Sequence, residues 1–492
     1  MTYSVAIPEH LNTELQSHLI RSDGQEDVCF ALWNPSCGAV RQTALIQTVL
    51  LPREGERLVH GNASFLPPYF ERAIEEALRE NCGIAFLHSH PVPGWQDMSD
   101  DDVAAELGLA PRVFAATHLP VVGLTLGADG TWSARFWEKR SPREYVRQWC
   151  ENVRSVGLRL RTSFADALVP PPSEIEEQIR TVSAWGYRKQ ADLSRLRIGV
   201  VGAGSVGSIV AEALARTGIS RITLIDFDIV KKHNLDRLLY STHLDAYLGR
   251  SKVSMLGRGL KRSATDRNFQ VCEMMYNVCE PEGYKAALDC DVLFSCVDRP
   301  LGRSVLNFIS FAHLIPVIDG GIRIEVDADE QLKAADWKIQ TSSPERRCLE
   351  CVGQYSPAMV SLEREGFLDD PEYIKGLSKN DALLRNENVF AFSANVASFE
   401  MLQLLQMVIA PLGISDSGEQ MYHFVPAIFD APIYASCNSN CPYPQLTAKG
   451  DRSGITVTSR SEIAEKARNA LRQRRLYKRV LDAMLPSIRF AI

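Results

Sequence analysis

The sequence predicts an α/β protein with two folded units in one chain of 492 residues. Residues 83–88 form an apolar run that ends in histidine and precedes a helical pattern, as expected of a buried strand that leads into a helix. Residues 198–207 form a second apolar run that passes into a Gly-x-Gly-x-x-Gly turn and another helix. A proline-rich stretch at residues 169–173 separates the two runs and is expected to be a linker.

The composition is that of an ordinary globular protein, with 45% hydrophobic and 23% charged residues. A net charge of -6 gives no reason to expect nucleic-acid binding. The first residues lack the basic and apolar segments of a signal peptide. The most apolar long stretch, residues 389–414, contains Glu400, Gln403 and Gln406 and is therefore expected to be a core helix rather than a membrane span. We expect a cytoplasmic protein with no membrane or nucleic-acid partner.

Four segments are expected along the chain: a first unit at residues 1–145, a helix and the linker at 146–175, a second unit at 176–446, and a tail at 447–492 with one basic helix. Hydrophobic periodicity predicts the elements of the first unit. They are strands at residues 28–33 and 43–50, helices at 68–81 and 100–109, a hairpin at 121–137 and a helix at 142–160.

The end of the strand at residues 83–88 carries a possible metal site. His88 and His90 are two residues apart, so both imidazoles point to the same side of a strand. Asp102 lies in the first turn of the next helix. Two imidazoles and a carboxylate can bind zinc and leave its fourth position open, which generates hydroxide near neutral pH and indicates a hydrolase. The alternative is that Ser99 and Asp102 form only a capping box and the histidines are packed or surface residues.

This constellation resembles the JAMM motif of the MPN metalloproteases, over roughly the first 140 residues. The resemblance implies a cytidine-deaminase-like α/β domain and an isopeptidase or precursor-processing activity. It assigns Glu26 as the general base and Ser99 as the hydrogen-bond donor to the oxyanion. Phe30 stands where many members of the family have glycine, and Asp27 is the alternative base. Glu26 could equally be a solvated acid at the end of a strand.

The glycine-rich turn predicts a nucleotide site. Gly202, Gly204 and Gly207 permit a tight turn, close approach of a phosphate and close packing of the following helix, whose N-terminus attracts anions. Asp226 ends the next strand and is placed to accept hydrogen bonds from ribose hydroxyls. By itself this pattern serves a dinucleotide as readily as ATP, and a dehydrogenase is therefore the alternative.

Polar residues further along make the nucleotide site more specific: Asp228, Asn234, Arg237, Lys252 and Asp298. With the glycine turn they resemble the ThiF/MoeB/HesA and ubiquitin-activating adenylyltransferase superfamily, over residues 176–445. The resemblance implies a Rossmann-like doubly wound domain that uses ATP and Mg²⁺. A dehydrogenase would not need Arg237, Lys252 or Asp298.

The same resemblance assigns a role to each residue. Asp226 binds the ribose, Asn234, Arg237 and Lys252 surround the phosphates, and Asp298 holds Mg²⁺. Arg180 completes the ATP site of the partner subunit in a homodimer. In the implied reaction a carboxylate attacks the α-phosphorus of ATP, and cations must offset the repulsion between the two anions.

Two cysteine pairs predict a structural zinc site: Cys348 with Cys351, and Cys437 with Cys441. The adenylyltransferase superfamily has such a site, and a redox dithiol is the alternative for either pair alone. Residues 352–436 contain no cysteine, although ubiquitin-activating enzymes place their thioester cysteine between the zinc pairs. Cys296 is expected to be a core residue rather than the nucleophile. Adenylation is therefore implied, whereas a thioester on this chain is in doubt.

The two motifs suggest opposite reactions on one kind of substrate. We expect the second unit to adenylate the C-terminal glycine of a ubiquitin-like protein, and the first unit to cut after the same glycine. A prokaryotic ubiquitin-like conjugation pathway with a conjugating enzyme, in antiviral defence, is the expected context. One alternative is activation and release of a ThiS- or MoaD-like sulfur carrier. The other is a scaffold that binds ubiquitin-like tails without turnover.

Overall fold

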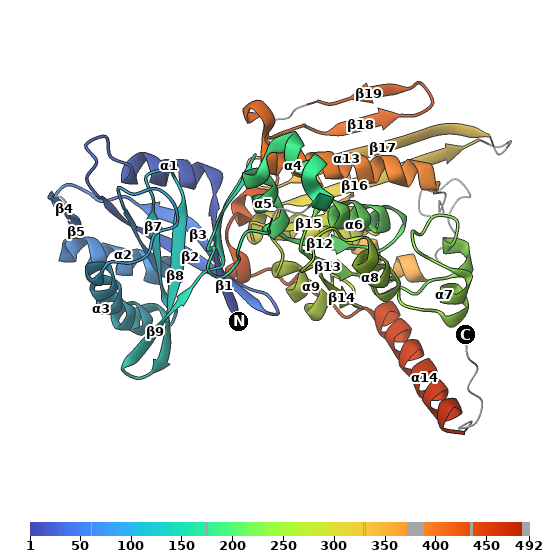
Figure 1. The fold of residues 1–492 in the computed structure, drawn as a ribbon, viewed down its shortest axis with the longest axis horizontal. Helices are drawn as coiled ribbons and strands as arrows, with labels where there is room; N and C mark the ends of the chain where they lie inside the picture. Colours follow the sequence, from blue (N-terminus) through green and yellow to red (C-terminus); the bar gives the residue numbers. More distant parts are fainter. Residues whose placement is uncertain are drawn as a thin grey trace.

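Two mixed β-sheets organise the fold, one in each half of the chain (Figure 1). The computed structural model describes residues 1–484 apart from 61, 174–175, 328, 330, 371–387 and 433–435, and it describes no side chains for 60, 62 and 474–484. The strand order of the first sheet is β11-β10-β1-β3-β2-β6-β7-β8-β9, and that of the second is β14-β13-β12-β15-β16-β17-β18-β19. The predicted tail beyond residue 484 and the end of the predicted linker, residues 174–175, lie outside the described residues.

The first sheet is covered by helices on both faces (Figure 1). Its strands are β1 (Thr2–Pro8), β2 (Val28–Cys37), β3 (Arg41–Leu50), β6 (Gly83–Ser89), β7 (Val121–Leu126), β8 (Trp132–Ser141), β9 (Glu144–Trp149), β10 (Asn152–Val156) and β11 (Leu160–Phe164). A hairpin of β4 (Arg57–His60) and β5 (Asn62–Phe65) is separate. The helices are α1 (Glu9–Leu19), α2 (Pro67–Glu80) and α3 (Asp100–Thr117). One apolar core lies under α1 and another under α2 and α3.

Strand β6 is an interior strand of this sheet and positions the histidines. All seven of its residues are buried, because β2 pairs with it on one side and β7 on the other. The register places His88 opposite Val28 on β2 and opposite Thr125 on β7. The predicted buried strand that ends at the histidine motif is therefore confirmed.

The predicted helix at residues 142–160 is wrong, and so is the helix in the segment 146–175. This stretch forms β9, β10 and β11, and all five residues of β10 are buried. Strand β10 pairs in parallel with β1, at the opposite end of the unit's sequence, and this pairing overrides the local apolar pattern. The first sheet consequently extends to residue 164, beyond the predicted boundary at 145. Helix α3 also continues past Pro111 to Thr117, although residue 109 was expected to end it.

The second sheet has the doubly wound order that the glycine turn predicts. Its strands are β12 (Arg197–Val201), β13 (Arg221–Ile225), β14 (Gln270–Met274), β15 (Val292–Ser295), β16 (Val317–Val326), β17 (Leu332–Ser342), β18 (Gln420–His423) and β19 (Ile428–Asp430). From β14 to β16 the neighbours are parallel, and from β16 onward they are antiparallel. The chain moves outward from β12 to β14 and then returns to the other side of β12 with β15. Such a reversal creates a crevice at the carboxyl ends of the two central strands, where ligands bind in this class of fold.

The helices of the second unit lie around this sheet, and the last of them, α14 (Glu462–Met484), projects away from it (Figure 1). They are α4 (Ile179–Trp185), α5 (Tyr187–Arg195), α6 (Ser205–Thr217), α7 (His243–Leu248), α8 (Lys252–Ser263), α9 (Pro281–Leu288), α10 (Pro300–Ala312), α11 (Pro357–Arg364), α13 (Phe390–Ile409) and α14 (Glu462–Met484). By length and composition, α13 is the one described helix that could cross a membrane. Half of it is buried, and it contacts α6, β16 and β17, as a helix packed on a sheet does.

A buried ionic cluster joins the two sheets. Asp291, just before β15, lies between Arg41 of β3 and Arg154 of β10, and all three side chains are 0% exposed. The Asp291 carboxylate is 2.7 Å from the Arg41 guanidinium and 3.4 Å from that of Arg154, and it accepts the backbone N–H of Arg197. Although burial alone would raise the pKa of Asp291, the two arginines hold it below its usual range. The two halves are therefore held together by charge that no water reaches.

The junction also contains a buried histidine, whose titration predicts a loss of stability in acid. His313 Nδ1 is 2.7 Å from Ser36 Oγ of β2, and its Nε2 is 2.7 Å from the Tyr284 hydroxyl of α9. Burial lowers the pKa of His313 from its ordinary value of 6.5 to about 3. Between these values the unfolded chain binds a proton that the folded chain does not, so this contribution is intact above pH 6.5 and falls toward pH 3, by about 1.4 kcal/mol per pH unit.

We expect His313→Gln to flatten this part of the pH profile. The measurement is urea unfolding of the wild type and the variant at pH 7, 6 and 5. The gap in unfolding free energy between them should change steadily below pH 6.5, since only the wild type carries this titrating group. Parallel profiles for the two proteins would contradict the prediction.

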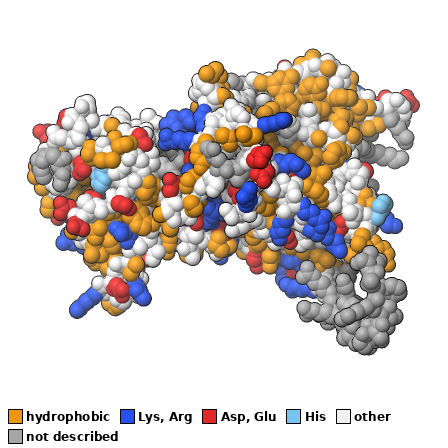
Figure 2. All heavy atoms as spheres, in the orientation of Figure 1, with side chains coloured by type: hydrophobic (Ala, Val, Ile, Leu, Met, Phe, Trp, Pro, Cys, Tyr) orange, Lys and Arg blue, Asp and Glu red, His pale blue; other side chains and the backbone are white. Residues whose placement is uncertain are grey.

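Hydrophobic side chains gather on one surface of the second unit (Figure 2). The surface lies over α13 and the β18–β19 hairpin, and its exposed apolar residues are Leu402, Leu412, Ile414, Phe424, Val425, Ile428 and Phe429. Contiguous exposed apolar surfaces often mark sites of contact with another protein. The predicted homodimer needs such a surface, and it stays a prediction.

Candidate functional site

The predicted metal ligands of the first unit come together in the structure. His88 ends β6, His90 follows it, and Asp102 lies in the first turn of α3. The Nε2 atoms of His88 and His90 are 3.2 and 3.3 Å from the two carboxylate oxygens of Asp102. A tetrahedral zinc site with bonds of about 2.0–2.1 Å has ligand atoms about 3.3–3.4 Å apart. The donor set therefore fits a zinc ion both in chemistry and in spacing.

The capping box of the alternative interpretation also forms, and it is compatible with a metal ion at the same residues. Ser99 Oγ accepts the backbone N–H of Asp102, and the Asp102 carboxylate accepts that of Ser99 at 2.8 Å. This capping box orients the carboxylate toward the histidines. The hydrogen bond that His90 donates to the Asp102 carboxylate raises the pKa of His90, with a further contribution from the Gln96 side chain. Gln96 is a residue that sequence reasoning missed, because nothing in its local pattern links it to His90.

The structure favours Glu26 over Asp27 as the acid that faces this cluster. Glu26 is half-buried; burial raises its pKa, and His90 and His88 lower it. Asp27 is instead 1% exposed and paired with Arg57 and Arg21. Its backbone N–H donates to Ser89 Oγ at 3.0 Å, which fixes this end of β2 next to the histidine strand. The alternative base is therefore occupied by structural contacts, and the catalytic role of Glu26 stays a prediction.

The glycine turn between β12 and α6 has the geometry that phosphate binding requires. Gly202 has φ of +94°, and a Cβ atom there would lie 2.4 Å from the Cys296 carbonyl oxygen. At Gly207 a Cβ atom would lie 1.8 Å from the Gly202 carbonyl oxygen, so this position must be glycine for the turn to close on the helix. Gly204 has nothing within 4 Å of its Cβ position. The turn is thus tightly packed on both sides and open at its middle glycine.

Three carboxylates and one ammonium group meet beside this turn. Asp226 follows β13, and its two oxygens accept the backbone N–H groups of Ala203 and Asp228, both at 2.7 Å. The Lys252 ammonium is 2.8 Å from the Asp228 carboxylate. Burial lowers the pKa of Lys252, but Asp226, Asp228 and, more weakly, Asp298 raise it above its ordinary value. The site therefore combines a permanent cation with acids on the two sides of the switch point.

Asn234 and Arg237 lie at the edge of this site. Both belong to the turn after β13, where Asn234 Oδ1 accepts the backbone N–H of Lys231 and the Arg237 guanidinium pairs with Asp236. The Ser205 hydroxyl, at the start of α6, donates to the Arg237 carbonyl oxygen at 3.0 Å. The turn is thereby attached to the helix N-terminus. Arg180 is exposed on α4, and its role in a partner subunit stays a prediction.

The four paired cysteines converge into a single group. One sulfur atom from each of Cys348, Cys351, Cys437 and Cys441 lies within 4.8 Å of the others, and those of Cys348 and Cys441 are 3.6 Å apart. The backbone N–H groups of Cys348, Cys351 and Asn438 donate to sulfur atoms of the group. A four-thiolate zinc site with bonds of about 2.3 Å requires sulfur atoms about 3.8 Å apart. The geometry fits a closed structural zinc site better than two separate redox pairs.

Cys296 has the surroundings of a core residue, as expected. Burial raises its pKa well above the ordinary value, and the nearby acids Glu400 and Asp319 add to this effect. A thiol that stays protonated is a poor nucleophile. Cys296 is therefore unsuited to carry a thioester.

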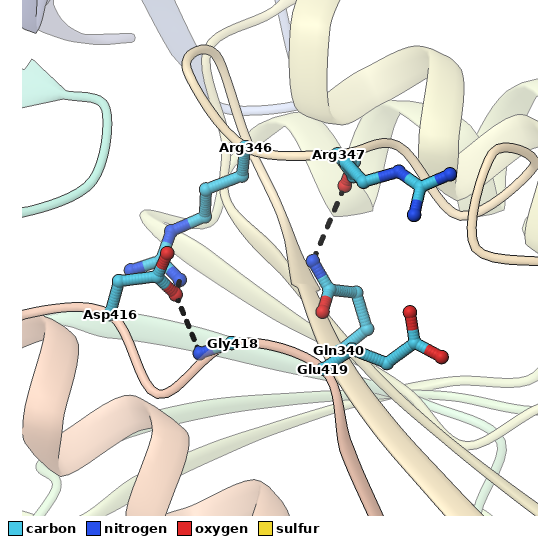
Figure 3. Close-up of a pocket in the computed structure, with 6 residues that line it drawn as sticks. All are labelled: Gln340, Arg346, Arg347, Asp416, Gly418 and Glu419. Atoms are coloured by element: carbon cyan, nitrogen blue, oxygen red, sulfur yellow. Dashed lines mark hydrogen bonds and ion pairs between the residues drawn. The ribbon is translucent and has the colours of Figure 1, made fainter. Parts of the chain in front are cut away.

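A small pocket lies beside the cysteine group (Figure 3). It is lined by Gln340, Arg346, Arg347, Asp416, Gly418 and Glu419. The Arg346 guanidinium pairs with Asp416, which also accepts the backbone N–H of Gly418, and Gln340 donates to the Arg347 carbonyl oxygen (Figure 3). These contacts tie the loop before β18 to the chain that leads into Cys348. The pocket therefore supports the cysteine group and offers little room for a substrate.

Comparisons with known proteins match the second unit. The curated relatives include a molybdopterin-synthase adenylyltransferase of Escherichia coli, 32% identical over 144 residues, which are 29% of this chain and 55% of the relative. A ubiquitin-like modifier-activating enzyme 5 of Xenopus laevis is 32% identical over 122 residues, 22% of this chain and 30% of the relative. An adenylyltransferase and sulfurtransferase of Yarrowia lipolytica is 29% identical over 199 residues, 40% of this chain and 47% of the relative. The chain thus spans about a third to a half of the length of these relatives.

A crystal structure of E. coli MccB with ATP has a TM-score of 0.41 and 16% identity, and covers 55% of this chain and 75% of that chain. A likeness of this size supports no further conclusion. The model of the ThiF family matches residues 175–422, about half of the chain and most of the second unit. The chain therefore belongs to the ThiF family.

Proposed function

We propose that this chain is an ATP-dependent adenylyltransferase that activates the C-terminal glycine of a ubiquitin-like or sulfur-carrier protein. The observation that carries the proposal is the meeting of the open glycine turn with Lys252, Asp226 and Asp298 at the switch point of the second sheet. Adenylyltransferases of both classes are among the relatives that match this region. The substrate class is proposed for this chain by analogy with these relatives.

The residues of the site suit a reaction between two anions. The N-terminus of α6 and the Lys252 ammonium attract the phosphates, and Asp226 accepts from the ribose hydroxyls. The turn that carries Asn234 and Arg237 closes the phosphate end. Asp298, at the carboxyl end of β15, would hold Mg²⁺, which when bound offsets the charge between carboxylate and triphosphate. These groups position the carboxylate in line with the α-phosphorus, and pyrophosphate leaves.

The adenylate then has to react with a group outside this chain. Residues 352–436 lack cysteine, and Cys296 is partly buried in surroundings that raise the pKa of its thiol. We therefore assign the accepting thiol to a partner, either a conjugating enzyme or a sulfur-transfer protein. With a conjugating enzyme as the partner, the context would be a prokaryotic ubiquitin-like conjugation pathway in the cytoplasm, in antiviral defence. With a sulfur-transfer protein as the partner, the context would be cofactor or cysteine synthesis.

A second activity is proposed for the first unit: a zinc-dependent isopeptidase or processing protease of the JAMM type. The spacing of His88, His90 and Asp102 supports it. Zinc bound there would supply an activated water. Glu26 would take the proton of that water and pass it to the leaving amine, and Ser99 would donate to the oxyanion. Both units would then bind the same extended C-terminal tail. A scaffold that binds the tail without turnover is the alternative.

Replacing Gly204 by alanine tests the adenylation proposal. The added methyl group meets no protein atom within 4 Å, but it would occupy the space where a phosphate approaches the turn. We expect thermal unfolding without nucleotide to be unchanged, while ATP affinity and pyrophosphate exchange fall by about tenfold or more, equivalent to about 1.4 kcal/mol. The exchange assay uses a panel of small ubiquitin-like and sulfur-carrier proteins ending in Gly-Gly.

Gly108→Ala is the matched control. This glycine lies in α3 and also has nothing within 4 Å of its Cβ position, so the change should leave ATP affinity and exchange as in the wild type. Panel proteins without their last glycine provide the substrate control. Absence of ATP binding by the wild type, or equal exchange with and without the terminal glycine, would refute the adenylation proposal.

A further inference from the structure

A buried ion pair lies directly behind the histidine cluster of the first unit. The Arg135 guanidinium of β8 forms a two-pronged contact with the Glu106 carboxylate of α3, and both side chains are 0% exposed. Trp137 donates its indole N–H to the same carboxylate at 2.6 Å. A Cβ atom on Gly123, which is paired with Arg135 across the sheet, would lie 2.2 Å from a Glu106 oxygen. The carboxylate therefore occupies the space that this glycine leaves open.

The pair includes Glu106 of the helix α3, which carries Asp102. Through Thr125 it also lies near the strand β6, which carries His88. Glu106 follows Asp102 by four residues, so the two lie one above the other on the same face of α3. Fixing Glu106 against β7 and β8 therefore fixes the depth and rotation of the turn that presents Asp102. On the other side, Arg135 donates to Thr125 Oγ1 at 2.6 Å, and this oxygen is 3.3 Å from Nε2 of His88. One guanidinium thus sets the position of Asp102 through Glu106. The Thr125 contact involves the His88 nitrogen that would bind zinc, so it would have to yield to the ion.

Stability alone is a weak reason for such a pair. Removing two charges from water costs several kcal/mol per ion, and well-packed apolar residues of similar volume often stabilise a core as much or more. The neighbouring positions on β7 and β8, such as Leu124 and Phe136, are apolar and fully buried. Two charges in this surrounding are expected where an orientation has to be fixed, since hydrogen-bonded outer contacts set the direction of metal ligands.

We propose that Arg135, Glu106 and Trp137 are positioning residues that set the distance between His88 and Asp102, and with it the zinc affinity of this site. The inference rests on the proposed zinc site of the first unit. It assigns no contact between these three residues and a substrate. It predicts that they act on metal affinity before any chemistry takes place.

The test compares zinc binding in the wild type, in Glu106→Gln, which keeps the side-chain volume, and in Trp137→Phe, which removes the indole N–H that holds the Glu106 carboxylate. Zinc content and affinity are measured by competition with a chromophoric chelator on the full chain. The four-cysteine group serves as an internal reference, and His90→Ala marks the loss of the histidine site. We expect the wild type to bind two zinc ions, and each variant to bind the ion of the histidine site about 10–100-fold more weakly with the cysteine-bound ion unchanged.

Ser133→Ala is the matched control, because this buried hydroxyl on β8 contacts only the backbone oxygen of Thr125. It should bind both ions as the wild type does. Folded variants with wild-type affinity at both sites would overturn the inference and leave the zinc site standing. If the wild type and His90→Ala hold the same single ion, the zinc site itself fails. Should Glu106→Gln not fold, Trp137→Phe still decides, since it leaves the ion pair intact.

Discussion

Replacing Asp291 by alanine is expected to destabilise the whole chain by about 3–5 kcal/mol, because it leaves two buried guanidinium groups without their carboxylate. Arg41, Arg154 and Asp291 are all 0% exposed, so water cannot solvate the charges that remain. The backbone N–H of Arg197 also loses its acceptor. The measurement is the free energy of unfolding in urea, followed by fluorescence and by circular dichroism.

Asp23→Ala is the control for this change. Asp23 also pairs with an arginine, Arg21, but at the surface, where ion pairs contribute little. Its unfolding midpoint should match that of the wild type. A loss below about 1 kcal/mol for Asp291→Ala would mean that the buried cluster relaxes or admits water, contrary to the expected penalty of an uncompensated buried charge.

Glu26→Gln and His90→Ala are expected to impair the hydrolysis proposed for the first unit in two different ways. Glu26→Gln keeps the ligand set, so the protein should retain zinc while cleavage falls about 10²–10⁴-fold through the loss of proton transfer. His90→Ala removes a ligand, and both the zinc ion and the activity should be lost. Cleavage is measured on the panel of Gly-Gly proteins, each extended beyond the last glycine or joined to a lysine.

Both variants should retain pyrophosphate exchange, because the adenylation residues lie in the other unit. Glu54→Gln, which changes an exposed acid of the first unit, serves as the control and should cleave at the wild-type rate. Normal cleavage by Glu26→Gln would exclude this residue as the base. A wild type that carries zinc at the histidine site but cleaves no panel member would favour a binding role for the first unit.

The glycine turn and the histidine strand could be read from the sequence because each is encoded within about ten neighbouring residues. Gly202, Gly204 and Gly207 belong to one turn, and His88 and His90 to one strand end. The family match and the sheet order confirm the Rossmann-like second unit. The JAMM resemblance of the first unit lies outside the family match and stays a prediction.

Residues 144–164 show what the local pattern could not reveal. Strand β10 is stabilised by its pairing with β1, some 150 residues earlier. The burial of Arg154 is explained only by Asp291, which lies beside it in the fold but far from it in the sequence. The same holds for Glu106 and Arg135, which read as ordinary surface charges along the chain. The role of Ser99 could not be decided from the sequence for another reason. Its side chain caps helix α3, while the Asp102 carboxylate takes part in the same cap and also faces the histidines.

The charges sealed between the two sheets make the halves of this polypeptide mutually dependent. A chain cut at the proline-rich connection would expose Arg41 and Arg154 on one fragment and Asp291 on the other. In the intact chain these surfaces are buried against each other. Neither fragment would be a faithful substitute for the part it came from. Measurements on either half are therefore best made on the intact chain.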